Sequence, residues 1–331
     1  MRGVFVKEAV LYEKADGKIQ CFSCLRECAI PNDKVGFCRT RKNVGGKLVS
    51  LYYGYFSGIR AQPLKTKPFL HFKDPVTGKI FSGEEQTLSI GGFSCNYECK
   101  GCQNVCVSKT PANVEDVAIR RTPRQIIDET LEKGIKIIAF TWNEPAIMPE
   151  IVFDVAKLAK ENGIRTVYVS NGSPTRKHLD LILPYIDAFR YDIKAGTEGG
   201  DKFYNYYCNF NISGEVHKIL ESIRYTKDAG KHIEILTVLV PRHEPCSAKS
   251  ILNTAHWIKD HLGDDTPWHL AKFFPAHEFN TPEFLTSDAM IDACAMLARS
   301  VGLTRVYGVK DMGCDCLKPE TTVKKTCSCC H

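Results

Sequence analysis

The sequence contains no run of 18 apolar residues, about the length that a helix needs to cross a bilayer. Its first nine residues lack the apolar core of a secretory signal, and no internal repeat, low-complexity tract or long charge run is visible. Lys and Arg exceed Asp and Glu only by 44 to 38. We therefore expect a cytoplasmic protein with no membrane association, and the small positive charge disfavours a nucleic-acid partner. The 331 residues, 44% of them hydrophobic, suffice for a full core.

Cysteine, in contrast, is abundant, with 16 residues. In a chain without an export signal, such cysteines are more typical of metal ligands or catalytic groups than of disulfides. Three stand alone and are expected to be small buried side chains: Cys208, Cys246 and Cys294. The others form three clusters: Cys21, Cys24, Cys28 and Cys38; Cys95, Cys99, Cys102 and Cys106; and Cys314, Cys316, Cys327, Cys329 and Cys330.

From about residue 86 onward, short apolar runs alternate with amphipathic stretches, which predicts an α/β protein with a parallel sheet. Six or seven βα units favour a partial or full (βα) barrel over a doubly wound sheet, with the active site at the carboxyl ends of the strands. We expect the barrel over residues 86–310, a cysteine-rich N-terminal cap over 1–85 and a cysteine-rich C-terminal tail over 311–331. The predicted strands are 86–91, 135–141, 165–169, 187–193, 233–240, 269–274 and 305–309; the predicted helices are 124–133, 146–161, 174–183, 216–223, 251–261 and 290–301.

The central cysteine loop follows the first of these strands and has the spacing C-x3-C-x2-C, formed by Cys95, Cys99 and Cys102. Three thiolates on one loop can bind three irons of a 4Fe–4S cluster and leave the fourth iron open for a substrate. Cys106 is a candidate fourth ligand, which would close the cluster. A zinc site is the alternative, but the loop contains no His as a fourth ligand.

This spacing resembles the signature of the radical S-adenosylmethionine (SAM) superfamily, and the resemblance extends over residues 86–309. Within it, the chain is similar to the pyruvate formate-lyase activating enzyme branch and, more closely, to AmmeMemoRadiSam-type proteins. The closer match rests on the motifs Cys21-Phe22-Ser23-Cys24, Gly36-Phe37-Cys38-Arg39-Thr40-Arg41-Lys42-Asn43, Lys67-Pro68-Phe69-Leu70-His71-Phe72, Cys102-Gln103-Asn104, Thr141-Trp142-Asn143-Glu144-Pro145 and Asp192-Ile193-Lys194.

The resemblance implies a 4Fe–4S cluster on Cys95, Cys99 and Cys102, with an open iron that chelates SAM, and argues against Cys106 as a fourth ligand. Reduction of such a cluster cleaves SAM to methionine and a 5′-deoxyadenosyl radical, which abstracts hydrogen from a substrate. The cofactors supply this chemistry, and the protein supplies position and exclusion of water.

Polar residues follow the next predicted strands. Glu144 is placed to pair with the ammonium of SAM, or is an acid at a helix start. Ser170 and Asn171 suit ribose or carboxylate contacts, or belong to a plain turn. Asp192 and Lys194 share one strand face and can both reach SAM, or form a surface ion pair.

Two histidines follow later strands. His277 lies in Phe274-Pro275-Ala276-His277, a stretch that resembles one near SAM in the activating enzymes. His243 is a weaker candidate, since a lone His is more often structural.

The N-terminal cysteines have the spacing C-x2-C-x3-C-x9-C, which fits either zinc or an auxiliary iron–sulfur cluster; a disulfide-linked cap is the third alternative. The C-terminal tail departs from the family pattern and ends with His331. It is a candidate metal site, electron relay or sulfur carrier, or a frayed end without function.

The function that these observations favour is a radical SAM enzyme acting on a protein or peptide. Radical SAM modification of RNA or of a small metabolite is the alternative, and a non-catalytic iron–sulfur or zinc electron carrier is another. A reductant such as ferredoxin or flavodoxin is the expected partner, and family resemblance adds Memo-like or AMMECR-like partners.

Overall fold

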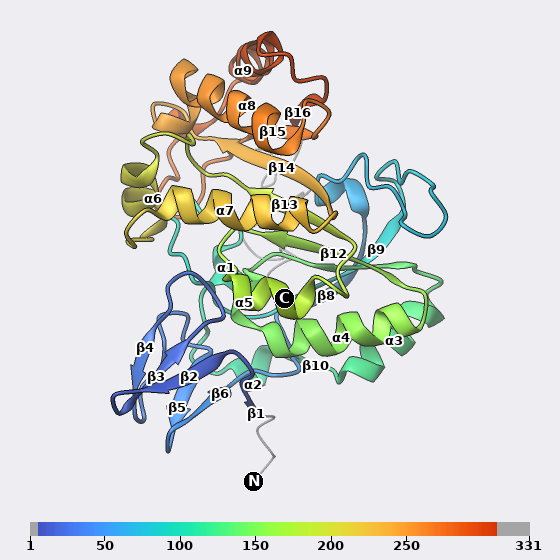
Figure 1. Cartoon of the computed structure of the whole chain (residues 1–331), viewed down its shortest axis with the longest axis vertical. Helices are drawn as coiled ribbons and strands as arrows, with labels where there is room; N and C mark the ends of the chain where they lie inside the picture. The colour runs from blue at the N-terminus through green and yellow to red at the C-terminus, as the bar shows by residue number, and fades with distance from the viewer. Residues whose placement is uncertain (1–5, 310–331) are drawn as a thin grey trace.

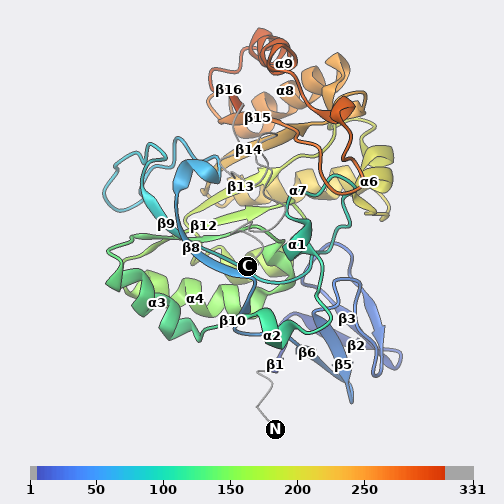
Figure 2. The same ribbon diagram turned by 180° about the vertical axis from the view of Figure 1, so that it is seen from behind.

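The computed structural model describes residues 6–309, and its centre is one eight-stranded sheet with the order β16-β15-β14-β13-β12-β11-β9-β8. Seven strands are parallel, and β8 pairs antiparallel with β9 at one edge, where Figure 2 shows the two side by side. Because β8 and β16 are both edges among the described residues, the sheet is open and the predicted barrel is a partial one. The strands are β8 (Gly58–Pro63), β9 (Gln86–Gly91), β11 (Ile137–Phe140), β12 (Arg165–Ser170), β13 (Ala188–Asp192), β14 (His232–Leu239), β15 (Trp268–Lys272) and β16 (Val306–Val309).

Helices connect the parallel strands, as the alternating pattern predicts, and α4, α5 and α7 lie in front of the sheet in Figure 1. The helix predicted over 124–133 begins as expected, because Thr122 and Gln125 form a reciprocal capping box ahead of it. The helices are α1 (Val105–Ser108), α2 (Val114–Val117), α3 (Pro123–Glu132), α4 (Pro149–Glu161), α5 (Arg176–Ile182), α6 (Asp201–Cys208), α7 (Glu215–Asp228), α8 (Ala248–Leu262) and α9 (Asp288–Ser300). No helix among residues 6–309 is long and apolar enough to span a membrane.

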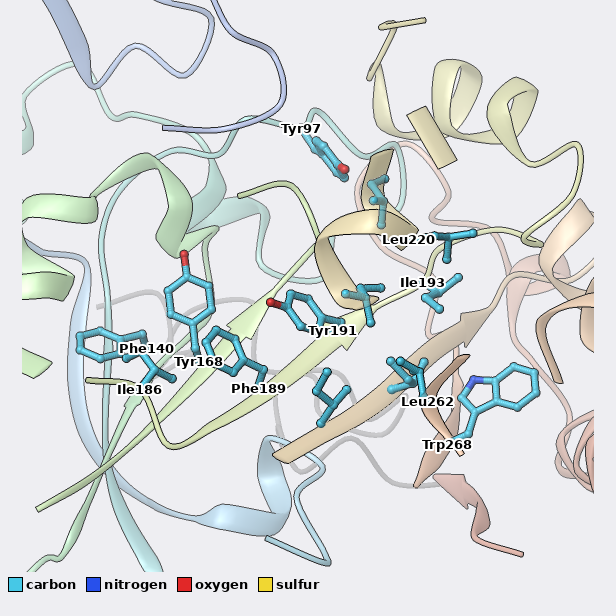
Figure 3. Packing of buried hydrophobic residues seen from close by; sticks show 14 of the residues in the cluster. Tyr97, Phe140, Tyr168, Ile186, Phe189, Tyr191, Ile193, Leu220, Leu262 and Trp268 are labelled. Atoms are coloured by element: carbon cyan, nitrogen blue, oxygen red, sulfur yellow. The ribbon is translucent and has the colours of Figure 1, made fainter. Parts of the chain in front are cut away.

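The main core lies between the sheet and these helices. Tyr168, Phe189 and Tyr191 come from neighbouring strands and pack side by side within it, as Figure 3 shows. The rings of Phe189 and Tyr191 are stacked, with centroids 5.6 Å apart. This layer fixes the spacing of the central strands and therefore the positions of the residues at their carboxyl ends.

The other face of the sheet packs against the segment of residues 64–81, which we call the plug. Leu64, Phe69, Phe72 and Phe81 form a second cluster with alternate residues of β11, β12 and β13. Glu234, near the amino end of β14, accepts hydrogen bonds from the backbone N–H groups of the plug residues 70 and 71. The plug therefore fills the space at the amino ends of the strands.

The fully buried Glu234 is matched by basic partners. His232 and His269 lie 3.0 and 2.6 Å from its two carboxylate oxygens. Burial alone would raise the pKa of Glu234, but hydrogen bonds from the two histidines outweigh it and lower the pKa to about 2. Glu234 thus anchors the plug as a carboxylate.

The N-terminal cap consists of two small antiparallel sheets beside the main sheet (Figure 1). One contains β1 (Lys7–Glu8), β5 (Arg41–Val44) and β6 (Lys47–Ser50), and the other β2 (Tyr12–Ala15), β3 (Lys18–Cys21) and β4 (Ala29–Pro31). A further pair is formed by β7 (Tyr55–Phe56) and β10 (Ile119–Arg120). The apolar cluster of the cap has only five buried members, so its packing alone contributes little stability.

The boundary predicted at residue 85 differs from the sheet topology. Strand β8 and the plug fall within the segment assigned to the cap, yet both pack on the main sheet. An antiparallel edge strand with a mixed sequence gives no apolar run, so the sequence pattern did not reveal it.

Candidate active site

The central cysteine loop lies directly after β9 and is held by backbone hydrogen bonds to the end of α6. The amide of Glu98 donates to the carbonyl of Cys208, and the amide of Lys100 donates to that of Tyr207, both at 2.9 Å. The loop carbonyl of Lys100 in turn accepts from the amide of Glu278 at 2.8 Å. These contacts fix the backbone that carries the three thiols.

Gly101 allows the loop to approach its neighbours closely. A Cβ atom at this position would lie 2.5 Å from Cζ of Phe273 and 2.6 Å from the hydroxyl of Tyr207. Both distances are shorter than any allowed contact, so a side chain here would displace the loop or the rings. The glycine therefore keeps Cys99 and Cys102 in position.

Cys95, Cys99 and Cys102 line one cavity at the carboxyl ends of the strands. Cys106 is exposed and does not line it. The same cavity is lined by five further residues that the sequence predicts as site residues: Glu144, Ser170, Asn171, Asp192 and Lys194. The remaining wall is largely apolar and includes Leu236, Val238, Val240 and Phe273.

The two histidine candidates lie elsewhere. His277 lines a neighbouring cavity that Cys95, Cys99 and Cys102 also line, on another side of the cysteine loop. His243 lies in an aromatic cluster, stacked on Phe279 at 5.1 Å. Because the neighbouring cavity borders the three cysteines, a place for His277 near SAM stays a prediction.

Glu144 is the most highly constrained side chain of the cavity, with 2% of its surface exposed. One carboxylate oxygen accepts from the amide of Ala146 and from the hydroxyl of Ser170, both at 2.9 Å. The other accepts from the amide of Asn171 at 2.7 Å. Burial raises the pKa of Glu144 to about 7, although these hydrogen bonds act in the opposite direction.

Asp192 lies between two cations. Its oxygens are 2.9 Å from Nη1 of Arg190 and 2.9 Å from Nζ of Lys194. Burial alone would raise the pKa of Asp192, but the two cations outweigh it and lower the pKa below its ordinary value. The trio carries one net positive charge, which suits a carboxylate-bearing ligand.

Several buried polar atoms around the cavity lack a hydrogen-bond partner, and each such atom destabilises the folded protein. They are Nε2 of Gln103, Nδ2 of Asn143, Nε of Arg190 and Oδ1 of Asp192, which Arg190 faces as an ion pair. Three of the four atoms are donors, so a ligand rich in acceptor atoms would satisfy them. SAM, with its carboxylate, ribose and adenine acceptors, fits this donor set, and the three thiols beside it fit an iron–sulfur cluster with one open iron.

Among residues 6–309, no three His, Cys, Asp or Glu side chains converge as ligands of one metal ion. The thiolates of a 4Fe–4S cluster bind separate irons, so this finding does not bear against a cluster. The third alternative for the cap, a disulfide link, is not formed, because Cys21, Cys24, Cys28 and Cys38 make no disulfide bond. The tail cysteines and His331 lie outside the described residues.

Sequence reasoning missed Arg190 and helix α6. Arg190 could have been found, because it is two residues before Asp192 and therefore shares its strand face. Helix α6 contributes Phe203 and Tyr207 to the cavity, while the hydroxyl of Tyr204 accepts from the amide of Lys194 at 2.9 Å. Its eight residues are too short and too mixed to give a clear helical period.

Comparisons with known proteins agree with this arrangement. A family model described as the radical SAM superfamily matches residues 90–255. An uncharacterized protein of Methanocaldococcus jannaschii is 31% identical over 304 residues, which cover 91% of this chain and 84% of that protein.

Solved structures resemble the chain more distantly. A domain of a pyruvate-formate lyase-activating enzyme from Bacteroides vulgatus is 17% identical, with a TM-score of 0.43 over 52% of this chain and 98% of that one. QueE from Escherichia coli is 10% identical, with a TM-score of 0.47 over 78% of this chain and 94% of that one.

Proposed function

Because the chain belongs to the radical SAM superfamily, we propose that it cleaves SAM reductively at a 4Fe–4S cluster and abstracts hydrogen from a further substrate. One observation carries this proposal. Three loop cysteines and five polar strand-end residues, far apart in the sequence, line a single cavity whose unpartnered donors match SAM. The cluster and SAM, when bound, supply the radical chemistry.

The residues of the chain would bind the cluster and orient SAM. Cys95, Cys99 and Cys102 hold the cluster. Three donors orient the two oxygens of the Glu144 carboxylate, which would accept a further hydrogen bond from the ammonium of SAM. Lys194, fixed by Asp192, offers a cation to the carboxylate of SAM.

The protein also keeps water from the reacting groups. The apolar residues of β14 and Phe273 line one side of the cavity, and the plug fills the space beneath it. These apolar side chains would limit the access of water to the reacting groups, and with it side reactions.

The test uses the anaerobically reconstituted full chain with dithionite. We expect release of 5′-deoxyadenosine and methionine, measured by liquid chromatography. A variant with Cys95, Cys99 and Cys102 all changed to Ala should release neither, and a Cys106→Ala variant should keep the activity of the wild type. Unchanged release from the triple variant would refute the assignment.

For the substrate we propose a protein or peptide, on the strength of the resemblance to the activating enzymes and AmmeMemoRadiSam-type proteins. The assay incubates the enzyme with extracts of cells grown in D2O and measures deuterium in the released 5′-deoxyadenosine. Protease treatment of the extract should abolish the deuterium, and nuclease should not. Loss after nuclease alone would point to RNA, and retention after both would point to a small metabolite.

For the electron donor we propose a reduced ferredoxin or flavodoxin. This proposal predicts that either protein replaces dithionite in the cleavage assay. Memo-like and AMMECR-like partners rest on the resemblance alone and stay predictions.

A further inference from the structure

The four cysteines of the cap line a second, small cavity. Cys21, Cys24 and Cys38 are buried, and Cys28 is half-buried. They come from β3, from the turn after it and from the segment before β5, so folding of the cap brings them together. This cavity lies against the main domain, where the amide of Leu25 donates to the carbonyl of Ser173 at 2.8 Å.

Three of these sulfur atoms accept hydrogen bonds suited to a negatively charged sulfur. Hydrogen bonds from N–H and O–H donors to sulfur are typical of metal-bound thiolates, because they stabilise the charge that remains on the ligand. The contacts are the amide of Arg26 to Cys24, the amide of Phe37 to Cys28, and the amide and hydroxyl of Thr40 to Cys38; the Cys21 thiol instead donates to the hydroxyl of Ser23 at 3.5 Å.

Arg41 supplies a second, independent observation. Its guanidinium lines the same cavity, is 1% exposed and pairs with Glu150 at 2.7 Å. Its Nε and Nη1 atoms are buried without a hydrogen-bond partner. A buried cation with two unsatisfied donors is costly unless an anion faces it. Four metal-bound thiolates would provide that anion.

We propose that Cys21, Cys24, Cys28 and Cys38 bind a second 4Fe–4S cluster, closed by four thiolates and hydrogen-bonded by Arg41. A zinc ion would require all four sulfur atoms to lie about 2.3 Å from one point. The four sulfur atoms line the cavity, but no three of them converge on one such point. The three sulfur atoms of the catalytic loop do not converge on one point either. Four thiolates on four separate irons match this arrangement.

The second cluster lies beside the catalytic loop. Asn96 lines the cap cavity and directly follows Cys95 in the chain. Its side chain is fixed, because its Nδ2 donates to Ser173 at 2.6 Å and its Oδ1 accepts from Asn171 at 2.9 Å. One residue thus connects the two sites.

The experiment measures iron, sulfide and zinc in anaerobically reconstituted full-length variants. The Cys95/Cys99/Cys102→Ala variant should retain about four irons and four sulfides per chain and, after reduction, the paramagnetic resonance signal of one cluster. Adding Cys24→Ala and Cys38→Ala should remove this iron, whereas adding Cys294→Ala, a buried cysteine remote from the cavity, should not.

One zinc per chain, or no metal, in the triple variant would overturn the proposal. Iron that survives the loss of Cys24 and Cys38 would do the same, because it would belong to other cysteines. If the five-fold variant does not fold, Cys24→Ala with Cys38→Ala in the wild-type chain should lower iron by about four per chain. The iron count does not depend on SAM cleavage, so the proposed function can fail while this site stands.

Discussion

The carboxylate of Glu144 offers the sharpest test of the cavity, through the variant Glu144→Gln. The amide is isosteric, but it has one acceptor oxygen where the carboxylate has two. In one orientation the amide oxygen faces Ala146 and Ser170, and the amide nitrogen faces the N–H of Asn171. In the flipped orientation the amide nitrogen faces the N–H of Ala146. One backbone donor therefore loses its partner in either orientation, and the charge facing the SAM ammonium is lost.

The magnitude follows from the charge-assisted hydrogen bond, worth roughly 1.5–3 kcal/mol. The dissociation constant of SAM should therefore rise about ten- to a hundredfold. Anaerobic titration calorimetry of the reconstituted protein measures it, and the visible absorption of the cluster should be unchanged. An unaltered dissociation constant would contradict a contact between Glu144 and SAM and would favour the alternative, that Glu144 is an acid at a helix start.

The same residue predicts a pH dependence. Because burial raises the pKa of Glu144 to about 7, the wild type loses the carboxylate as the pH falls below that value, and SAM binding should weaken by up to about tenfold per pH unit. The Gln variant should show no such change. Ser170→Ala removes one hydrogen bond to the carboxylate but keeps its charge, so the midpoint should move to higher pH. A wild-type affinity that is constant between pH 5 and 8 would contradict this reasoning.

Three further changes test other parts of the structure. Gly101→Ala places a Cβ 2.5 Å from the buried Phe273, so we expect loss of catalytic-cluster iron and a lower melting temperature of the apoprotein, measured by iron analysis and thermal unfolding. Glu234→Ala leaves two backbone N–H groups of the plug unsatisfied and should lower the free energy of unfolding by roughly 2–6 kcal/mol in urea titrations. Burial, followed by the charge of Arg190, lowers the pKa of Lys67 to about 7. Between pH 7 and 10 the unfolded chain therefore binds more protons than the folded chain. The free energy of unfolding should rise with pH in this range by up to about 1.4 kcal/mol per pH unit. Lys67→Met should flatten this slope; an equal slope in both proteins would show that other groups cause it.

The sequence predicts the parts of the fold that depend on local pattern. Apolar β-branched runs and capped amphipathic helices give the βα order, and the carboxyl ends of parallel strands place Glu144 and Asp192 together. What depends on packing between distant segments was not predictable. The plug has no period, because its phenylalanines are fitted to the sheet one by one. Strand order also does not say on which side of the cysteine loop His277 lies, so its contact with SAM stays a prediction.

The plug has a consequence for how turnover is controlled. Because the plug fills the face of the sheet below the cavity, we expect the substrate to enter from the opposite side and to exclude solvent there. We then expect coupling to depend on substrate size: a full substrate keeps the ratio of SAM consumed to product formed near unity. Short fragments leave the entrance open to solvent, so we expect more SAM to be cleaved per product formed in their presence. The ratio of 5′-deoxyadenosine to product, followed along a series of truncated substrates, would read out how much of the entrance each one covers.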